Sequence, residues 1–126
     1  MSWNSYDSIK STWSQIKQSR GRNGDKDVSV GIDGVTQSIF DENLENNIRE
    51  IERKLICFLT KNTQVAYNFA PLRTKTISNE PGKFREIHIP RIRDQIVFRL
   101  ISNEIINIII KKNPIFRTSQ ALQFKE

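Results

Sequence analysis

The chain has 126 residues, about the length of one domain, and carries 20 Lys and Arg against 14 Asp and Glu, a formal net charge of +6. Its one cysteine, Cys57, has no second cysteine to bridge, which argues against a disulfide-stapled secreted scaffold. The sequence shows neither a signal-peptide pattern nor an apolar run long enough to span a bilayer, so we expect a soluble, cytoplasmic protein without a membrane partner.

The positive charge is confined to the second half of the chain. Residues 1–70 carry 9 Lys or Arg and 9 Asp or Glu, whereas residues 71–126 carry 11 against 5. This asymmetry favours a polyanionic partner, most often nucleic acid. A surface that is basic only for solubility explains the charge equally well, so composition alone leaves both interpretations open.

Two helices are predicted before residue 61, on either side of a glycine-rich loop. Apolar residues at helical spacing predict the first helix over residues 7–20. For the second helix, Ser38 and Asp41 have the spacing of a capping box, Thr36 is another N-cap candidate, and the apolar period continues over residues 38–60. We therefore divide the chain into residues 1–35, a helix and a loop, and residues 36–126, a second unit.

A β-hairpin is predicted over residues 69–90, where the apolar period changes. "FAPLRTKTI" and "KFREIHI" indicate two strands, and "SNEPG" between them indicates a turn. Alternation places Arg73 and Lys75 on one face of the first strand, and Lys83 and Arg85 on one face of the second. If pairing joins these faces, we expect four cations to cluster near the tip, with isoleucines at the base.

The last predicted element is a helix over residues 92–112 with a broad apolar face. Pro114 cannot continue the helical hydrogen bonds and therefore ends it. The expected fold class is α+β, with helices packed around a short antiparallel β-hairpin.

No residue pattern in the chain predicts a catalytic or metal-binding site. The sequence contains no HxxxH, no CxxC and no paired Asp-Asp. His88, the single histidine, is expected to be a structural or surface residue, and Asp33 and Asp94 are expected to cap a turn and a helix start. Without clustered carboxylates, the chain is not expected to build a two-metal phosphoryl-transfer site.

The basic hairpin allows two interpretations. Arg85 could hold phosphate oxygens through two donors, with Lys83 and Lys75 acting as point charges. Alternatively, these cations only protect the edges of an ordinary hairpin from pairing with another sheet. Composition does not decide between the two.

The order of several short motifs along the chain resembles the amino-terminal portion of bacterial reverse transcriptases of the group II intron, retron and phage-defence type. In that family a Gly-(Ile/Val)-Asp-Gly turn leads into a helix, then into a fingers hairpin ending in Ile-Pro, then into a helix that begins with Arg-Asp. The motifs here are "WSQIK", "GIDGVT", "FDENL", "PGKFREIHIP" and "RDQIV", between about residues 13 and 119. The resemblance implies a fingers subdomain whose palm is absent from this chain.

The resemblance implies roles for the basic residues. Arg85 matches the fingers arginine that contacts the triphosphate of the incoming dNTP, and Lys75 is the candidate for a second triphosphate contact. The implied contacts to the RNA template and the DNA or RNA primer are made by the remaining basic residues of this region, namely Lys83, Arg73, Arg91 and Arg93. Asp33 and Gly34 match the structural turn.

The chain also departs from the family pattern. Asn79 stands where the family has a second triphosphate-binding lysine, and Gln95 stands where it has an arginine. The palm aspartates that would bind Mg²⁺ lie downstream of this region in the family, so this chain alone is expected to be inactive and to need a palm domain of the same or another chain. The alternative is a non-catalytic nucleic-acid-binding module, or a scaffold subunit for a separate polymerase chain.

Overall fold

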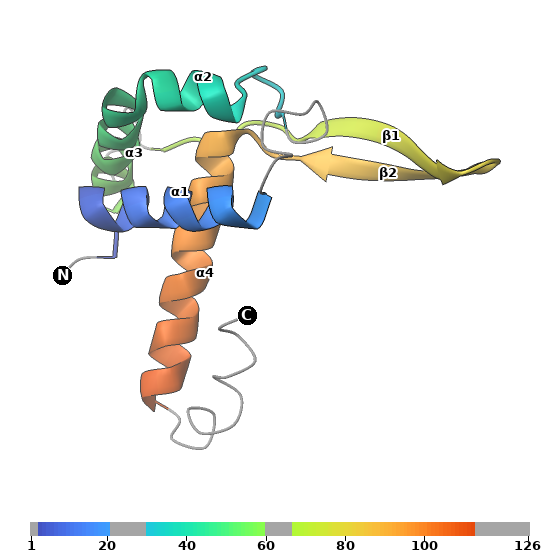
Figure 1. The fold of residues 1–126 in the computed structure, drawn as a ribbon. Helices are drawn as coiled ribbons and strands as arrows, with labels where there is room; N and C mark the ends of the chain where they lie inside the picture. The colour runs from blue at the N-terminus through green and yellow to red at the C-terminus, as the bar shows by residue number, and fades with distance from the viewer. Residues whose placement is uncertain (1–2, 21–29, 60–66, 113–126) are drawn as a thin grey trace.

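The computed structural model describes residues 3–20, 30–59 and 67–112. Within these ranges the chain forms four helices and one two-stranded antiparallel hairpin, which confirms the α+β class (Figure 1). The elements in chain order are α1 (Tyr6–Arg20), α2 (Gln37–Glu42), α3 (Leu44–Leu59), β1 (Arg73–Glu80), β2 (Lys83–Ile89) and α4 (Ile92–Lys112). The predicted loop before residue 30 and the tail after Lys112 lie outside the described residues.

The helices share one hydrophobic core. α1 contributes Ile9 and Trp13, whose side chains are fully buried in a cluster that they share with residues of α3 and α4. The Trp13 ring meets the Phe40 ring edge-on at a centroid distance of 5.0 Å, and its indole N–H donates to Asp41 Oδ1 at 2.8 Å. The other apolar members of this core are Ile16, Ile48, Ile51, Leu55, Tyr67, Ile92, Ile96, Val97 and Leu100.

The single helix predicted over residues 38–60 is wrong, because the segment is broken at Asn43 into α2 and α3. Asn43 leaves the helical conformation, with φ −129° and ψ 42°, and its backbone N–H donates to the carbonyl of Phe40. The Asn47 side chain caps the same carbonyl at 3.0 Å. Apolar spacing continues across the break, so periodicity could not reveal it. Thr36, the second N-cap candidate, is the cap observed: its hydroxyl accepts from the N–H of Ile39 at 3.2 Å.

The hairpin is longer at its tip and shorter at its base than predicted. β1 begins at Arg73 rather than residue 69, and only Pro81 and Gly82 connect the strands. Gly82 has φ +77°, as the second central position of a type II turn requires. Such a turn fits poorly with strand twist, and the strand register shifts between Ile77 and Glu80.

Most of the hairpin projects beyond the helices (Figure 1). The upper half of α4 crosses behind α1 and packs against it, while its lower half extends below the other helices. Among the described residues, no helix combines the length and apolar character needed to cross a membrane.

The Gly-Ile-Asp-Gly turn packs against the start of α4. Gly31 is buried, and a Cβ atom at this position would lie only 2.3 Å from the Cα of Arg91. Gly34 has φ +71°, and its N–H donates to the carbonyl of Gly31 at 3.1 Å. Asp33 accepts from the N–H of Val35 at 3.1 Å, which confirms its expected structural role in the turn. The first glycine is therefore required by a close backbone approach.

Replacing Gly31 with Ala should lower the free energy of unfolding by about 2 kcal/mol, because the added methyl group overlaps the backbone of α4. Gly34→Ala is the matched control, since nothing lies within 4 Å of its Cβ position and only the left-handed backbone is strained, at about 1 kcal/mol. Urea denaturation followed by tryptophan fluorescence measures both. Gly31→Ala with the stability of the unsubstituted chain would contradict the close approach.

Candidate nucleic-acid interface

A buried carboxylate lies where the hairpin meets α4. Asp94, in the first turn of α4, is only 1% exposed. Its Oδ1 accepts from the hydroxyl of Tyr67 at 2.5 Å, and its Oδ2 accepts from the N–H of Ala70 at 2.9 Å. Arg91 forms an ion pair with Oδ2 at 3.1 Å. One side chain therefore joins the segment before β1 to the segment after β2, and the expected structural role of Asp94 is confirmed.

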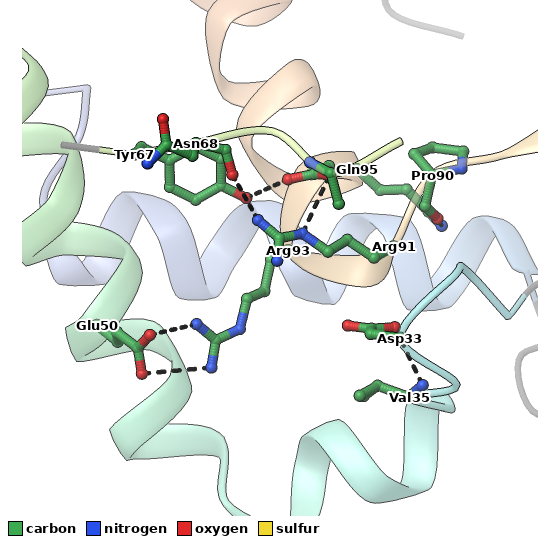
Figure 2. A network of polar contacts seen from close by, with 11 residues as sticks. Asp33, Val35, Glu50, Tyr67, Asn68, Pro90, Arg91, Arg93 and Gln95 are labelled. Atoms are coloured by element: carbon green, nitrogen blue, oxygen red, sulfur yellow. Dashed lines mark hydrogen bonds and ion pairs between the residues drawn. The ribbon is translucent and has the colours of Figure 1, made fainter. Parts of the chain in front are cut away.

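Arg91 and Tyr67 complete this junction. The Arg91 guanidinium donates to the carbonyl of Asn68 at 2.6 Å and lies 5.8 Å from the centre of the Tyr67 ring (Figure 2). Burial and the hydrogen bond to Asp94 raise the pKa of Tyr67 well above its ordinary value. Its hydroxyl is therefore protonated at neutral pH and donates to Asp94.

A second ion pair joins α4 to α3. The Arg93 guanidinium donates to Oε1 of Glu50 at 2.6 Å and to Oδ1 of Asn47 at 3.0 Å, as Figure 2 shows for the Glu50 contact. Lys54 contacts the same carboxylate at 2.9 Å. The hydrogen bonds from Arg93 and Lys54 lower the pKa of Glu50 to about 2. The first turn of α4 is thus held on both sides, by Asp94 toward the hairpin and by Arg93 toward α3.

Gln95 fixes the same turn to α1. Its amide N–H donates to the carbonyl of Pro90 at 2.7 Å, and its carbonyl oxygen accepts from the Arg20 guanidinium. Sequence reasoning treated Gln95 only as a departure from the family pattern and assigned no role to Tyr67. Neither contact has a local sequence signal, because the partners of Gln95 and Tyr67 lie 75 and 27 residues away in the chain.

Arg91 and Arg93 were predicted to contact nucleic acid. In the structure both guanidiniums are mostly buried and engaged with carboxylates of the same chain. They neutralise charge at the junction and position the hairpin base. Their contact with nucleic acid stays a prediction.

The prediction that four cations cluster near the tip is wrong. The predicted faces do coincide, but the register places Arg73 opposite Ile89 and Lys75 opposite Ile87, in the half of the hairpin nearest the helices. Only Lys83 and Arg85 lie toward the tip. The strands run antiparallel, so residues early in β1 face residues late in β2, and the cations spread along the arm.

The tip cations differ in how they are engaged. Lys83 pairs with Glu80 at 3.3 Å, and both side chains are well exposed. The Arg85 side chain is exposed and makes no hydrogen bond or ion pair with any residue that the structure describes. Arg73 and Lys75 are half-buried, and each interacts with another group of the chain. Arg85 is therefore the best placed of the hairpin cations to bind an external phosphate. The side chain of Asn79 lies outside the described part.

The carboxylates at the junction do not fit a Mg²⁺ site. Asp94 and Glu50 are occupied by cationic and hydrogen-bond donors from the chain itself. Across residues 3–20, 30–59 and 67–112, no group of three or more His, Cys, Asp or Glu side chains could hold a metal ion. His88 is exposed on the hairpin, with Nδ1 3.3 Å from the Thr74 hydroxyl.

The second half of α4 exposes the rest of its apolar face. In its first half Ile92, Ile96, Val97 and Leu100 are buried, whereas Ile101, Ile105, Ile108 and Ile109 are 36–52% exposed. Phe98 begins this exposed stripe and stacks on Phe69 at a centroid distance of 4.8 Å. The sequence predicted the face correctly, but not that half of it would lack a partner among the described residues.

Comparison of the chain with protein-family models, with curated proteins and with solved structures found no match. The resemblance to reverse transcriptases therefore rests on the residues and motifs of this chain alone.

Asp94→Asn should lower the free energy of unfolding by about 3 kcal/mol, because it leaves the mostly buried Arg91 without its countercharge. The amide N–H of the new side chain would also face the Tyr67 hydroxyl or the Ala70 N–H, both of which are donors to Asp94. Hydrogen exchange should quicken at the Ala70 amide, which loses its acceptor. Asp7→Asn, at an exposed position in α1, is the control and should change stability by less than about 1 kcal/mol. Equal denaturation midpoints for the two variants would rule out the proposed junction.

Glu50→Gln should remove a pH-dependent contribution to stability. The folded-state pKa of Glu50 is about 2 against an ordinary 4.5, so its stabilisation is present above pH 4.5 and is lost as pH falls toward 2. Because the carboxylate is one-third exposed, we expect a difference of about 1 kcal/mol from the unsubstituted chain at pH 7. That difference should shrink below pH 4.5 and close near pH 2.

Urea titrations at several pH values measure this effect. Glu42→Gln is the control, since this exposed carboxylate makes no ion pair with a described residue. If Glu50→Gln and Glu42→Gln lose stability in parallel on acidification, the Arg93–Glu50 pair does not contribute.

Proposed function

We propose that this chain is the fingers portion of an RNA-directed DNA polymerase, with its hairpin contacting the template–primer backbone and the triphosphate of an incoming dNTP. The observation that carries the proposal is Arg85: an exposed guanidinium, without a partner among the described residues, on a hairpin that projects from the helices. A guanidinium binds two phosphate oxygens at once through its planar donors. The order of motifs around it, from the Gly-Ile-Asp-Gly turn to the Arg-Asp helix start, supports the same assignment.

The rigid base of the hairpin supports this role. Phosphoryl transfer depends on positioning and charge neutralisation, so the cation must be held in a defined place. Asp94 ties both ends of the hairpin base, and Gly31 packs behind the same turn of α4. An arm anchored in this way would present Arg85 without a large loss of conformational entropy on binding.

The exposed apolar stripe of α4 supports a partner domain. Phe98, Ile101, Ile105 and Ile108 follow a 3–4–3 spacing, which places them on one side of the helix. Exposed apolar residues in such a contiguous row mark an interaction surface. We assign this surface to a palm domain of the same or another chain, which would supply the Mg²⁺-binding aspartates; Mg²⁺ would then neutralise charge on the triphosphate.

Arg85→Ala should weaken binding of a labelled RNA–DNA template–primer and reduce the slope of log K against log salt by about 1, because one phosphate contact is lost. Arg53→Ala is the matched control: it removes the same charge from an exposed position on α3 that has no partner among the described residues. Fluorescence anisotropy over a series of salt concentrations measures both variants.

Primer extension separates the polymerase from a plain binding module. The chain should show no Mg²⁺-dependent extension by itself, and in a complex with a palm Arg85→Ala should lower kcat/KM for dNTP by roughly tenfold or more. Salt-dependent binding with unchanged extension kinetics would leave a nucleic-acid-binding module and exclude the dNTP role. Binding that does not respond to salt, or equal losses for Arg85→Ala and Arg53→Ala, would exclude the phosphate contact.

A further inference from the structure

Phe84 stands out at the hairpin tip. It is 72% exposed, the most exposed large hydrophobic residue in the described part of the chain. It lies on β2 directly between Lys83 and Arg85, close to the Pro81-Gly82 turn. An exposed apolar residue is ordinary by itself, but an aromatic ring between two cations on a projecting arm requires an explanation.

Packing within the chain does not explain this ring. Alternation along β2 places Phe84 on the same face as Glu86 and His88, and the facing residues of β1 are the hydroxyl-bearing Thr74 and Thr76. Phe84 makes no ring contact with another described residue. Its face of the hairpin is polar, so the ring does not belong to an apolar patch of the kind that a protein partner would cover.

A hollow lies beside the ring at the hairpin tip. It has a volume of about 200 Å³ and is lined by Ile77, Glu80, Lys83, Phe84 and Arg85. Among the described residues the hairpin has two strands, and none of these residues pairs with the outer edge of β2. Consecutive side chains of a strand point to opposite faces; a nucleotide crossing this edge could therefore place its base toward Phe84 and its phosphate toward Arg85.

We propose that Phe84 stacks on an unpaired nucleobase while Arg85 holds the adjacent phosphate, so that the hairpin tip prefers a single strand over a duplex. Every base has a π-face, and stacking on an aromatic side chain does not depend on base identity. In a duplex both faces of each internal base are already covered by its neighbours, so the ring gains no contact there. The positive charge of the tip arginine favours a polyanion over an uncharged aromatic ligand. This inference rests on the proposed nucleic-acid contact of the hairpin.

The test uses the 126-residue chain and 12-nucleotide labelled probes: single-stranded RNA, single-stranded DNA, and a blunt duplex of the same sequence. Phe84→Ala should weaken binding of the single strands roughly tenfold and leave binding of the duplex unchanged. Phe84→Tyr keeps the ring and should bind like the unsubstituted chain. A single strand with abasic sites should remove the difference between Phe84→Ala and the unsubstituted chain.

The salt dependence distinguishes this inference from the proposed function. Phe84→Ala removes no charge, so its slope of log K against log salt should equal that of the unsubstituted chain, whereas Arg85→Ala lowers the slope. If Arg85→Ala leaves the salt slope unchanged while Phe84→Ala still weakens binding of the single strands alone, the phosphate contact is overturned and the stacking is retained. Unchanged single-strand affinity for Phe84→Ala, or equal losses on single strand and duplex, would overturn the stacking. Urea denaturation midpoints confirm that both variants are folded.

Discussion

The carboxylate of Asp94 is the interaction on which the arrangement of this molecule depends. It is nearly inaccessible to water, and the groups around it come from both ends of the hairpin: Tyr67 and Ala70 before β1, and Arg91 after β2. Burying a charge is unfavourable unless it is paired and hydrogen-bonded. These contacts satisfy that requirement together, so the base of the arm is held in one orientation relative to α4.

The contacts around this carboxylate divide the hairpin into a fixed base and an open tip. At the base, Gly31 allows the backbone of α4 to approach, Gln95 reaches α1, and Arg93 reaches Glu50 of α3. At the tip, the side chains of Arg85 and Phe84 are exposed, and neither contacts a described residue through a hydrogen bond, an ion pair or a ring. At the base, Arg91 and Arg93 form ion pairs with carboxylates of the same chain, whereas at the tip an arginine and an aromatic ring are accessible to a ligand.

Local sequence patterns predicted the helices and strands better than they predicted the break between α2 and α3 or the pairing of the two strands. Helical spacing identified α1 and α4, strand alternation identified the shared face of the hairpin, and Thr36 was recognised as a cap candidate. The break at Asn43 was missed because apolar spacing runs through it, and it depends on backbone capping rather than on hydrophobicity. The expected cation cluster failed for another reason: antiparallel pairing brings together opposite ends of the two strands, which a single-strand pattern does not reveal.

The sequence by itself determined the α+β class, the basic second half and the arginine of the hairpin as a candidate phosphate contact, because these follow from composition and from periods of two and 3.6 residues. Only the tertiary structure decided which of three arginines pair with carboxylates of the chain: Arg91 and Arg93 do, whereas the Arg85 side chain makes no polar contact with a described residue. Arg91, Arg93 and Arg85 are equivalent as sequence letters. They differ because Arg91 pairs with the buried Asp94 and Arg93 pairs with Glu50 of α3, whereas Arg85 stays in solvent.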